Sequence, residues 1–287
     1  MASTGSFRSA AARMYTSQPA VSRTIARLER ELGSELLDRG PRGARLTPAG
    51  VTLAEHARRI GVAMAVMRTE LVDGPRSRIR LGAAATAAGS FLAPFLAEWI
   101  PAHPTVRVEV IEDGSVKLRE RLADGECDLA IVPLPLGNDF EAVPLARLSV
   151  RAYFPAGHVL DTDDPDITVD ELAPHPLVVN STNFLAGRSF VQECEACGLF
   201  PRIVYRSNVG QTLAALAEAG LGVAVFGDTV DLRGFTLRSR ALHTREGQPM
   251  GFPLAVAWHR VETAEWIREF GQALAAFPQR SRGSVVS

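Results

Sequence analysis

The stretch SQPAVSRTIARLEREL, residues 17–32, decides how this 287-residue chain is organised. At about 100° per residue, its apolar side chains fall on one narrow face of a helix and its arginines on the opposite face. Thr16 or Ser17 can cap the helix, and Pro19 is tolerated in the first turn, where its missing N–H would have no partner. Gly33 predicts the end of this helix. The apolar face holds Val21, Ile25, Leu28 and Leu32, and the basic face holds Arg23, Arg27 and Arg30.

This predicted helix suits DNA binding through its N-terminal end. Small polar side chains gather there, at Ser17, Gln18 and Ser22. Such an end can enter a major groove while the arginines contact phosphates. An ordinary amphipathic surface helix with solvated arginines would show the same pattern, so both interpretations remain open on this stretch alone.

The neighbouring segments favour the DNA-binding interpretation. Residues 6–14 predict a second helix capped by Ser6, and the short link to Ser17 predicts a helix-turn-helix. Residues 35–46 have apolar ends around a Gly-Pro-Arg-Gly turn, which predicts a small hairpin, or wing. The wing offers Arg39, Arg42 and Arg45 to a phosphate backbone or a minor groove.

Charge is distributed unevenly along the chain. The formal net charge is −1, but residues 1–74 carry +4 and the remainder carries −5. A basic head on an acidic body indicates a polyanionic partner for the head. The sequence has no apolar run long enough to span a membrane and no signal-peptide core at its start, so we expect a cytoplasmic protein.

A long helix is predicted for residues 47–74. Thr47 caps it, Pro48 opens it, and Asp73-Gly74-Pro75 ends it near Val72. Its apolar residues repeat at heptad a and d positions, which favours a two-helix seam in a homodimer. A helix packed on its own body is the alternative. The predicted dimerisation residues are Leu53, Ala57, Ile60, Met64, Met67 and Leu71.

From residue 78 onward, strands alternate with helices, which predicts an α/β body with a mostly parallel sheet. Two similar halves follow one another, and they suggest two lobes with a ligand bound between them. Strands are expected at 79–83, 106–111, 129–132, 177–179, 203–205, 223–226 and 254–258, and helices at 90–100, 116–122, 184–197, 209–219 and 264–277.

The head resembles the N-terminal domain of LysR-type transcriptional regulators. The resemblance rests on Gly5-Ser6-Phe7, on residues 17–22, on residues 36–39 and on Leu46-Thr47-Pro48-Ala49-Gly50. It implies that the start of the helix at 17–32 contacts bases and phosphates and that the wing adds phosphate contacts. The residues expected to bind double-stranded promoter DNA are Ser17, Gln18, Pro19, Ser22, Arg23, Arg27, Arg42 and Arg45.

One feature departs from the family pattern. The family has a further amphipathic helix before Gly5-Ser6-Phe7, whereas this sequence begins at Met1-Ala2-Ser3. We expect the true start to lie upstream, and the intact mass of the natively expressed protein tests this. If Met1 is the start, the head should be less stable and should bind DNA more weakly. A truncated regulator that dimerises through residues 48–72 and sequesters a partner is the alternative function.

The body resembles the LysR-type effector-binding domain, which has the periplasmic-binding-protein fold, through Arg80-Leu81-Gly82 and residues 122–132 and 217–224. The resemblance implies two Rossmann-like lobes, with the chain crossing between them near Val150–Pro155 and Trp258–Thr263. The expected plan is a winged helix-turn-helix at 1–46, a linker helix at 47–74 and an effector domain at 76–287. Lobe I then takes about 76–152 and 260–287, and lobe II about 153–259.

Polar residues between predicted strands and helices are candidates for effector binding. They lie beside free N–H groups at helix starts, which favours an anionic or strongly polar effector. Simple N-capping is the alternative role for such residues. The candidates are Thr86, Asn180, Ser181, Thr182, Asn183, Ser207 and Asn208.

No catalytic constellation is recognisable in the sequence. It lacks GxSxG, HExxH and phosphate-loop patterns, and its six histidines have no metal-ligand spacing. Cys194 and Cys197 form a CxxC without a second pair, and the acidic run at 161–166 lacks the glycine that a calcium loop needs. We therefore expect no enzyme activity, metal or cofactor, but promoter DNA, a small effector and a homodimer or homotetramer.

Overall fold

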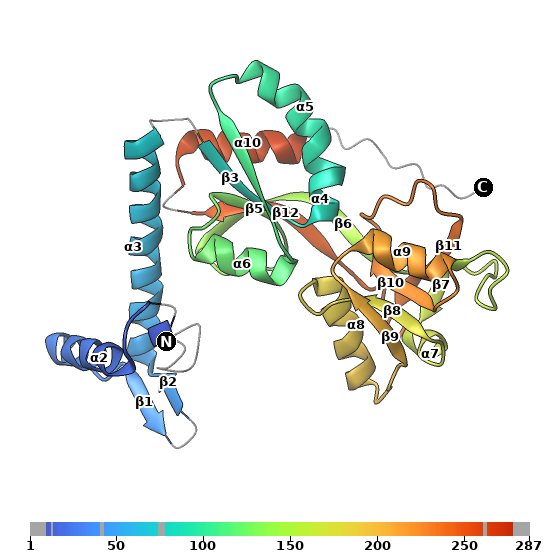
Figure 1. Ribbon diagram of the computed structural model, residues 1–287, viewed down its shortest axis with the longest axis horizontal. Helices are drawn as coiled ribbons and strands as arrows, with labels where there is room; N and C mark the ends of the chain where they lie inside the picture. Colours follow the sequence, from blue (N-terminus) through green and yellow to red (C-terminus); the bar gives the residue numbers. More distant parts are fainter. Residues whose placement is uncertain (1–9, 13, 41–42, 74–77, 261–262, 278–287) are drawn as a thin grey trace. The chain divides into compact units, whose positions relative to one another are not determined.

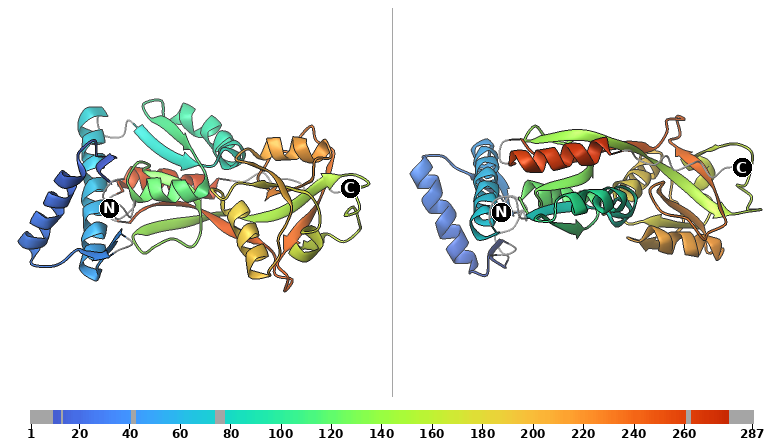
Figure 2. Two further views of the ribbon diagram at one scale, coloured as in Figure 1. Left: turned by 60° about the horizontal axis from the view of Figure 1, so that its bottom comes forward. Right: turned by 90° about the horizontal axis from the view of Figure 1, so that it is seen from above.

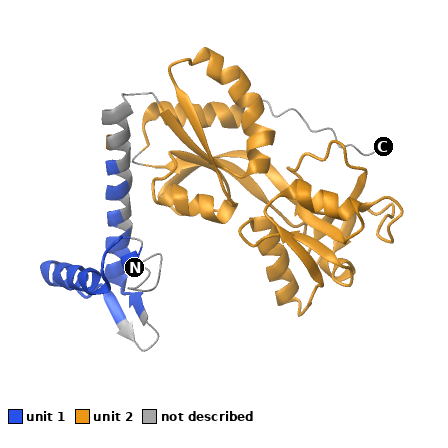
Figure 3. Ribbon diagram, in the orientation of Figure 1, with its two compact units in different colours: residues 1–65 blue, residues 66–287 orange. Residues whose placement is uncertain are grey.

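The computed structural model describes residues 10–12, 14–40, 43–73, 78–260 and 263–277 (Figure 1). The chain divides into two compact units, unit 1 at residues 1–65 and unit 2 at residues 66–287 (Figure 3).

Unit 1 is built around α2 (Gln18–Leu32), which follows a helical turn at residues 10–12. The Ser17 hydroxyl accepts a hydrogen bond from the Ala20 N–H, at 3.4 Å, and Gly33 ends the helix with a φ of 64°. A left-handed φ is readily adopted by glycine because it has no Cβ. The predicted caps are therefore confirmed. The first part of the apolar face packs on the preceding turn, whereas Leu32 is half exposed; this small core contains Ala10, Ala11, Val21 and Ile25.

The predicted wing is confirmed as the antiparallel pair β1 (Leu37–Gly40) and β2 (Gly43–Leu46). The middle of its turn, including Arg42, lies outside the described residues. The Glu29 carboxylate accepts hydrogen bonds from the Leu36 and Leu37 N–H groups, at 3.0 and 3.2 Å. This carboxylate joins α2 to the base of the wing and sets the position of the wing relative to the helix.

The predicted linker helix is confirmed as α3 (Pro48–Asp73). The Thr47 hydroxyl accepts a hydrogen bond from the Gly50 N–H, at 3.0 Å, and donates one to the Glu35 carbonyl, at 2.6 Å. A single side chain thus caps the start of α3 and ties it to the chain that leads into the wing.

Unit 2 contains a 10-stranded mixed sheet with the order β4-β3-β5-β12-β6-β10-β8-β9, with β11 paired to β6 and β7 paired to β11. The pairs β3–β4, β3–β5, β8–β9 and β8–β10 are parallel, as expected within each lobe. The strands are β3 (Arg78–Ala83), β4 (Arg107–Glu112), β5 (Leu129–Pro133), β6 (Phe140–Pro155), β7 (Asp166–Thr168), β8 (Leu177–Asn180), β9 (Ile203–Ser207), β10 (Val223–Gly227), β11 (Leu237–His243) and β12 (Gly251–His259).

The long strand β6 joins the two lobes of unit 2. Its residues 140–149 pair with β12 in lobe I, and its residues 150–155 pair with β10 and β11 in lobe II. This agrees with a first crossing near Val150. The return differs from the prediction of Trp258–Thr263, because β12 pairs with β5 along Leu254–Trp258 and so belongs to lobe I. The strand pairing puts the return between β11 and β12, near Met250.

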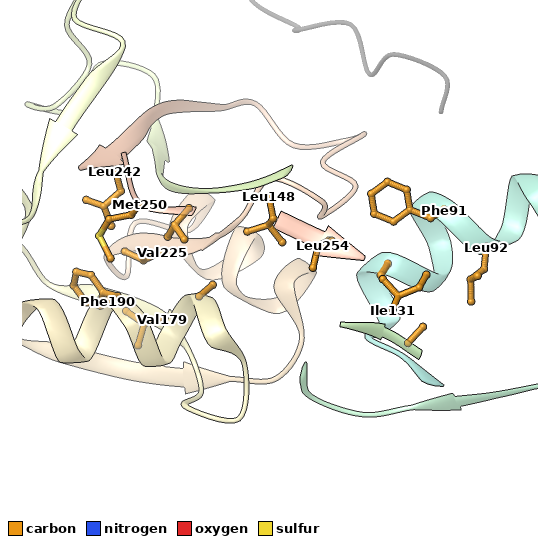
Figure 4. Packing of buried hydrophobic residues seen from close by; sticks show 14 of the residues in the cluster. Phe91, Leu92, Ile131, Leu148, Val179, Phe190, Val225, Leu242, Met250 and Leu254 are labelled. Carbon is orange, nitrogen blue, oxygen red and sulfur yellow. The ribbon is translucent and has the colours of Figure 1, made fainter. Parts of the chain in front are cut away.

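Helices cover both faces of the sheet in each lobe (Figure 2). Successive side chains of a strand point to opposite faces, so β5 directs Leu129 and Ile131 to one core and Ala130 and Val132 to another. The larger core continues from lobe I into lobe II, with Leu148 and Leu254 in its middle (Figure 4). The covering helices are α5 (Ala93–Ala102), α6 (Ser115–Ala123), α7 (Val169–Leu172), α8 (Leu185–Ala196), α9 (Gly210–Glu218) and α10 (Glu265–Ala276).

The first helix of unit 2 begins earlier than predicted. Helical structure starts with α4 (Ala85–Ala87), passes through one π-helical turn, η1 (Ala88–Leu92), and continues as α5. The predicted helix at 90–100 and the predicted loop before it are therefore wrong at this boundary. Residue 84 is an alanine that supplies no side-chain cap, so the sequence has no local start signal here.

Candidate DNA-binding surface and effector pocket

The candidate DNA-binding residues of unit 1 are solvent-accessible on α2 and the wing. Gln18, Pro19, Arg23 and Arg27 are exposed, and Ser22 is half-buried one turn after Gln18. Arg27 lies 3.6 Å from Glu31 in an exposed pair, which holds the guanidinium only weakly. On the wing, Arg45 is exposed, and Arg42 lies outside the described residues.

The turn before α2 contributes a residue that the sequence did not indicate. Tyr15 is 98% exposed and has a φ of 48°, which is uncommon for a residue with a side chain. It stands two residues before the Ser17 cap, so its side chain lies at the start of α2. Only the backbone geometry reveals this position, because a tyrosine in a short link carries no pattern of its own.

The predicted dimerisation residues give α3 an exposed apolar face. Ile60, Met64 and Met67 are 62%, 54% and 48% exposed, and their spacing puts them on one side of the helix. Ala57 is also exposed and Leu53 is half-buried, while the side chain of Leu71 lies outside the described residues. Among the described residues, this face is available for a partner helix.

A pocket lies between the two lobes of unit 2, with a cavity volume of about 50 Å³. Its walls come from the carboxyl ends of β5, β8 and β10, from the first residues of α4, α6, α8 and α9, and from β6 and β12. The lining contains no charged side chain. It is formed by Ala84, Thr86, Ala87, Ser115, Ile131, Pro133, Leu148, Asn180, Phe184, Leu185, Ala186, Asn208, Gly210, Gly227, Thr229, Val230, Phe252 and Leu254.

Three of the seven predicted effector residues line this pocket: Thr86, Asn180 and Asn208. Thr86 does so from the first turn of α4 and not from a loop. Asn180 is buried, and its side-chain amide donates to the Ser207 carbonyl, at 3.4 Å. Ser181 is not in the lining, and its hydroxyl donates to the side-chain carbonyl of the lining residue Asn208.

The other predicted effector residues have different roles. Thr182 is exposed and is not part of the lining. The Ser207 hydroxyl accepts a hydrogen bond from the Val209 N–H, at 3.0 Å, so it stabilises the turn before α9. The Asn183 side chain faces lobe I, where it donates to the Asp113 carboxylate at 3.4 Å.

Asn183 belongs to a junction between the lobes at one side of the pocket. The Val116 N–H donates to the Asn183 carbonyl at 3.2 Å, and the Leu185 N–H donates to the Ser115 hydroxyl at 3.0 Å. Gly114 permits this approach, because a Cβ there would lie 2.5 Å from the Asn183 carbonyl oxygen. The interlobe junction therefore consists of 113–116 from lobe I and 183–185 from lobe II.

The carboxyl of Asp113 is held in its charged form at this junction. Partial burial raises its pKa, but hydrogen bonds from the Gly114 N–H and from the Arg121 and Asn183 side chains outweigh this, so the pKa is lowered overall. Arg121 lies 3.2 Å from the carboxylate. The charge therefore helps to orient Asn183.

Several lining residues were absent from the sequence prediction. The hydroxyls of Ser115 and Thr229 and the apolar side chains of Leu148, Phe252 and Leu254 all face the pocket. Ser115 starts a helix and could have been found by the same rule as Thr86. The apolar residues come from β6 and β12, and their place in the pocket depends on long-range strand pairing.

These parts define a class: a winged helix-turn-helix unit on the same chain as a two-lobed α/β unit with an interlobe pocket. The family model described as "LysR substrate binding domain" matches residues 73–277, and "Bacterial regulatory helix-turn-helix protein, lysR family" matches residues 1–51. The chain belongs to the LysR family of transcriptional regulators, as its resemblance implied.

Relatives and solved structures agree with this assignment. The HTH-type transcriptional regulator AlsR of Bacillus subtilis (strain 168) is 30% identical over 228 residues, covering 76% of this chain and 74% of the relative. CysB of Burkholderia cenocepacia is 31% identical over 226 residues, covering 76% and 72%. The crystal structure of HinK from Pseudomonas aeruginosa, at 22% identity, covers 94% of this chain and 92% of its own with a TM-score of 0.57, which shows the shared fold.

None of the helices in the described parts of the chain combines the length and hydropathy that a membrane-spanning segment requires. Within the same residues, no three His, Cys, Asp or Glu side chains are grouped as metal ligands would be.

Proposed function

We propose that this regulator binds promoter DNA through α2 and the wing, and that a small effector in the interlobe pocket controls its activity. The effector carries an acidic or strongly polar group and an apolar part. The chain acts as a homodimer or homotetramer through the exposed face of α3.

The observation that carries the effector proposal is the convergence of helix starts on one pocket. Ser115 opens α6, Leu185 opens α8 and Gly210 opens α9, and the residue before each of these helices makes no side-chain cap. The Val116 and Leu185 N–H groups are engaged in the interlobe junction, so an anion would use other first-turn N–H groups. First-turn N–H groups and the positive end of the helix dipole attract an anion. Because the pocket lining itself has no charged side chain, we infer that the helix starts contribute positive potential at the lining.

The rest of the lining favours an effector with an apolar body. Phe184, Leu148, Phe252 and Leu254 contribute an apolar wall to a lining that also holds hydroxyl and amide groups. Small-molecule sites commonly combine such a wall with a few polar groups that fix orientation. Carboxylic acids with a short alkyl or aromatic part meet both requirements.

A thermal-shift screen of such acids against the full chain tests the effector proposal. A ligand present at about 100 times its Kd stabilises the folded state by about 2.7 kcal/mol through mass action. A true pocket ligand should lose this effect in Thr229→Val and keep it in Thr236→Val, a change of the same chemistry outside the lining. Equal stabilisation of both variants would place the ligand elsewhere.

A second candidate function is sequestration of a partner through α3 without DNA binding, and the exposed Ile60, Met64 and Met67 support it. A salt-dependent mobility shift with DNA from upstream of the regulator's own gene separates the two. A DNA-binding regulator should shift this DNA and lose affinity steeply as salt rises. A sequestering protein should dimerise and give no shift at low salt.

A further inference from the structure

Two arginines, one from each lobe, lie one helical turn away from residues that line the interlobe pocket, although neither is itself in the lining. Arg119 lies on α6, one helical turn after Ser115, and Arg188 lies on α8, one turn after Leu185. Residues three or four apart share a helix face, so each arginine follows a pocket-lining residue on the same side of its helix. The two helix starts are in contact through the hydrogen bond between the Leu185 N–H and the Ser115 hydroxyl.

Both guanidinium groups are directed toward the pocket end of their helices. Arg119 Nη2 donates to the carbonyl of Pro133, a lining residue, and to that of Pro135, at 3.0 Å. Arg188 Nε donates to the Thr182 carbonyl, at 3.3 Å, just before α8 begins. These bonds hold the arginines in place through neutral acceptors and leave their charges uncompensated.

The two charges act on each other across the junction. Burial lowers the pKa of Arg119 first, and the positive charge of Arg188 lowers it further. Within the described residues, neither guanidinium has a carboxylate partner. Other arginines of unit 2 do, as in Arg80 with Asp128, at 2.6 Å, and Arg245 with Asp170, at 2.5 Å.

We propose that Arg119 and Arg188 form an oxyanion subsite at the rim of the pocket, which takes the second acidic group of a dianionic effector. A guanidinium presents a planar fork of N–H donors that matches a carboxylate, sulfate or phosphate group. An acidic group bound between the two guanidinium groups would replace their mutual repulsion by attraction of both to one shared anion. The dianionic effector rests on the proposed function, whereas the oxyanion subsite can be tested without it.

Sulfate is the probe for the subsite. The full-length protein is titrated with sodium sulfate against sodium chloride at constant ionic strength, and the melting temperature and calorimetric heat are recorded. Sulfate should bind the wild type saturably, and Arg119→Gln and Arg188→Gln should each weaken that binding by about tenfold, the effect of losing a charged hydrogen-bond pair. Arg107→Gln in lobe I and Arg202→Gln in lobe II are matched controls, since both arginines are exposed at the amino ends of strands.

Sulfate binding that is equal in the wild type and in all four variants would overturn the subsite. Because this result would not affect stabilisation by monocarboxylic acids, it is distinguishable from failure of the proposed effector pocket.

Straight-chain dicarboxylates from malonate to pimelate identify the source of the anion. A dicarboxylate of matching length should stabilise the wild type more than sulfate and more than the monocarboxylate of the same length. Arg119→Gln should abolish this excess. If every dicarboxylate stabilises no more than sulfate, the subsite takes a free inorganic anion and the dianionic effector is wrong.

Discussion

Replacement of Gly114 by alanine should loosen the interlobe junction without unfolding either lobe. The added methyl carbon would lie 2.5 Å from the side-chain amide nitrogen of Asn183 and 2.5 Å from its backbone carbonyl oxygen, whereas ordinary contact begins at 3.4 Å. The chain segments around Gly114 and Asn183 must therefore separate by about 1 Å. Overpacking of this kind costs about 1–3 kcal/mol, which corresponds to about a fivefold to 150-fold change in the population of the open junction.

Hydrogen–deuterium exchange measures this opening directly. In the closed junction, the Val116 N–H donates to the Asn183 carbonyl and the Leu185 N–H to the Ser115 hydroxyl, so both amides are protected. Exchange in peptides covering 114–118 and 183–187 should accelerate by the same fivefold to 150-fold factor in Gly114→Ala. Gly137→Ala is the matched control, because a Cβ there meets no atom within 4 Å. Unchanged exchange in a folded Gly114→Ala protein would refute the tight junction.

Three further predictions concern stability and reactivity. Asp128→Ala should destabilise unit 2 by about 3–5 kcal/mol in chemical denaturation, because it leaves the largely buried Arg80 without the carboxylate 2.6 Å away; a loss below about 1 kcal/mol would contradict this. Acidification should weaken the junction. The pKa of Asp113 is lowered in the folded state, so its charge adds stability above the ordinary pKa of 3.8, and this stability is lost as the pH falls through the lower, folded-state value. Hydrogen exchange at 183–187 should therefore accelerate on acidification, and it should do so less in Asp113→Asn. Burial raises the pKa of the Cys127 and Cys194 thiols to about 11 from 9.0, so native alkylation at pH 8 should be about a hundredfold slower than after unfolding, and equal rates would count against their burial.

The DNA-binding unit was largely predictable because its signals are local. A capping serine, a proline in the first turn and a left-handed glycine bound α2 within its own sequence. The Gly-Pro-Arg-Gly turn and its apolar flanks likewise determine the wing. The role of the Glu29 carboxylate, which joins these elements, could not be predicted. Its partners are the backbone N–H groups of Leu36 and Leu37, and backbone groups leave no pattern in the sequence.

The effector unit was predictable in its buried central strands and much less so at the pocket. Segments such as Leu129–Pro133 are continuously buried and apolar, which identifies them as core strands. The strands β7 and β11 and the helix α7 were missed because they are short or only partly buried. β6 was missed because its pattern changes where it passes from one lobe to the other.

Pocket residues divide in the same way. Thr86, Asn180 and Asn208 were found because polar residues at strand–helix boundaries can be recognised locally. Leu148 and Leu254 reach the pocket only because β6 and β12 pair over about a hundred residues of intervening chain. Asn183 shows the limit of the local rule, since its side chain turns to Asp113 in the other lobe.

Fluorescence anisotropy with labelled upstream DNA across a salt series tests whether α2 reads promoter DNA, as we propose. The wild type should bind in the nanomolar to micromolar range, and Arg23→Ala should weaken binding and reduce the slope of log K against log salt by about one. Arg233→Ala, at an exposed arginine of lobe II, should change neither quantity. The dimer mass should be the same in all three proteins. Absence of binding by the wild type at low salt, or equal affinity of Arg23→Ala, would contradict the claim.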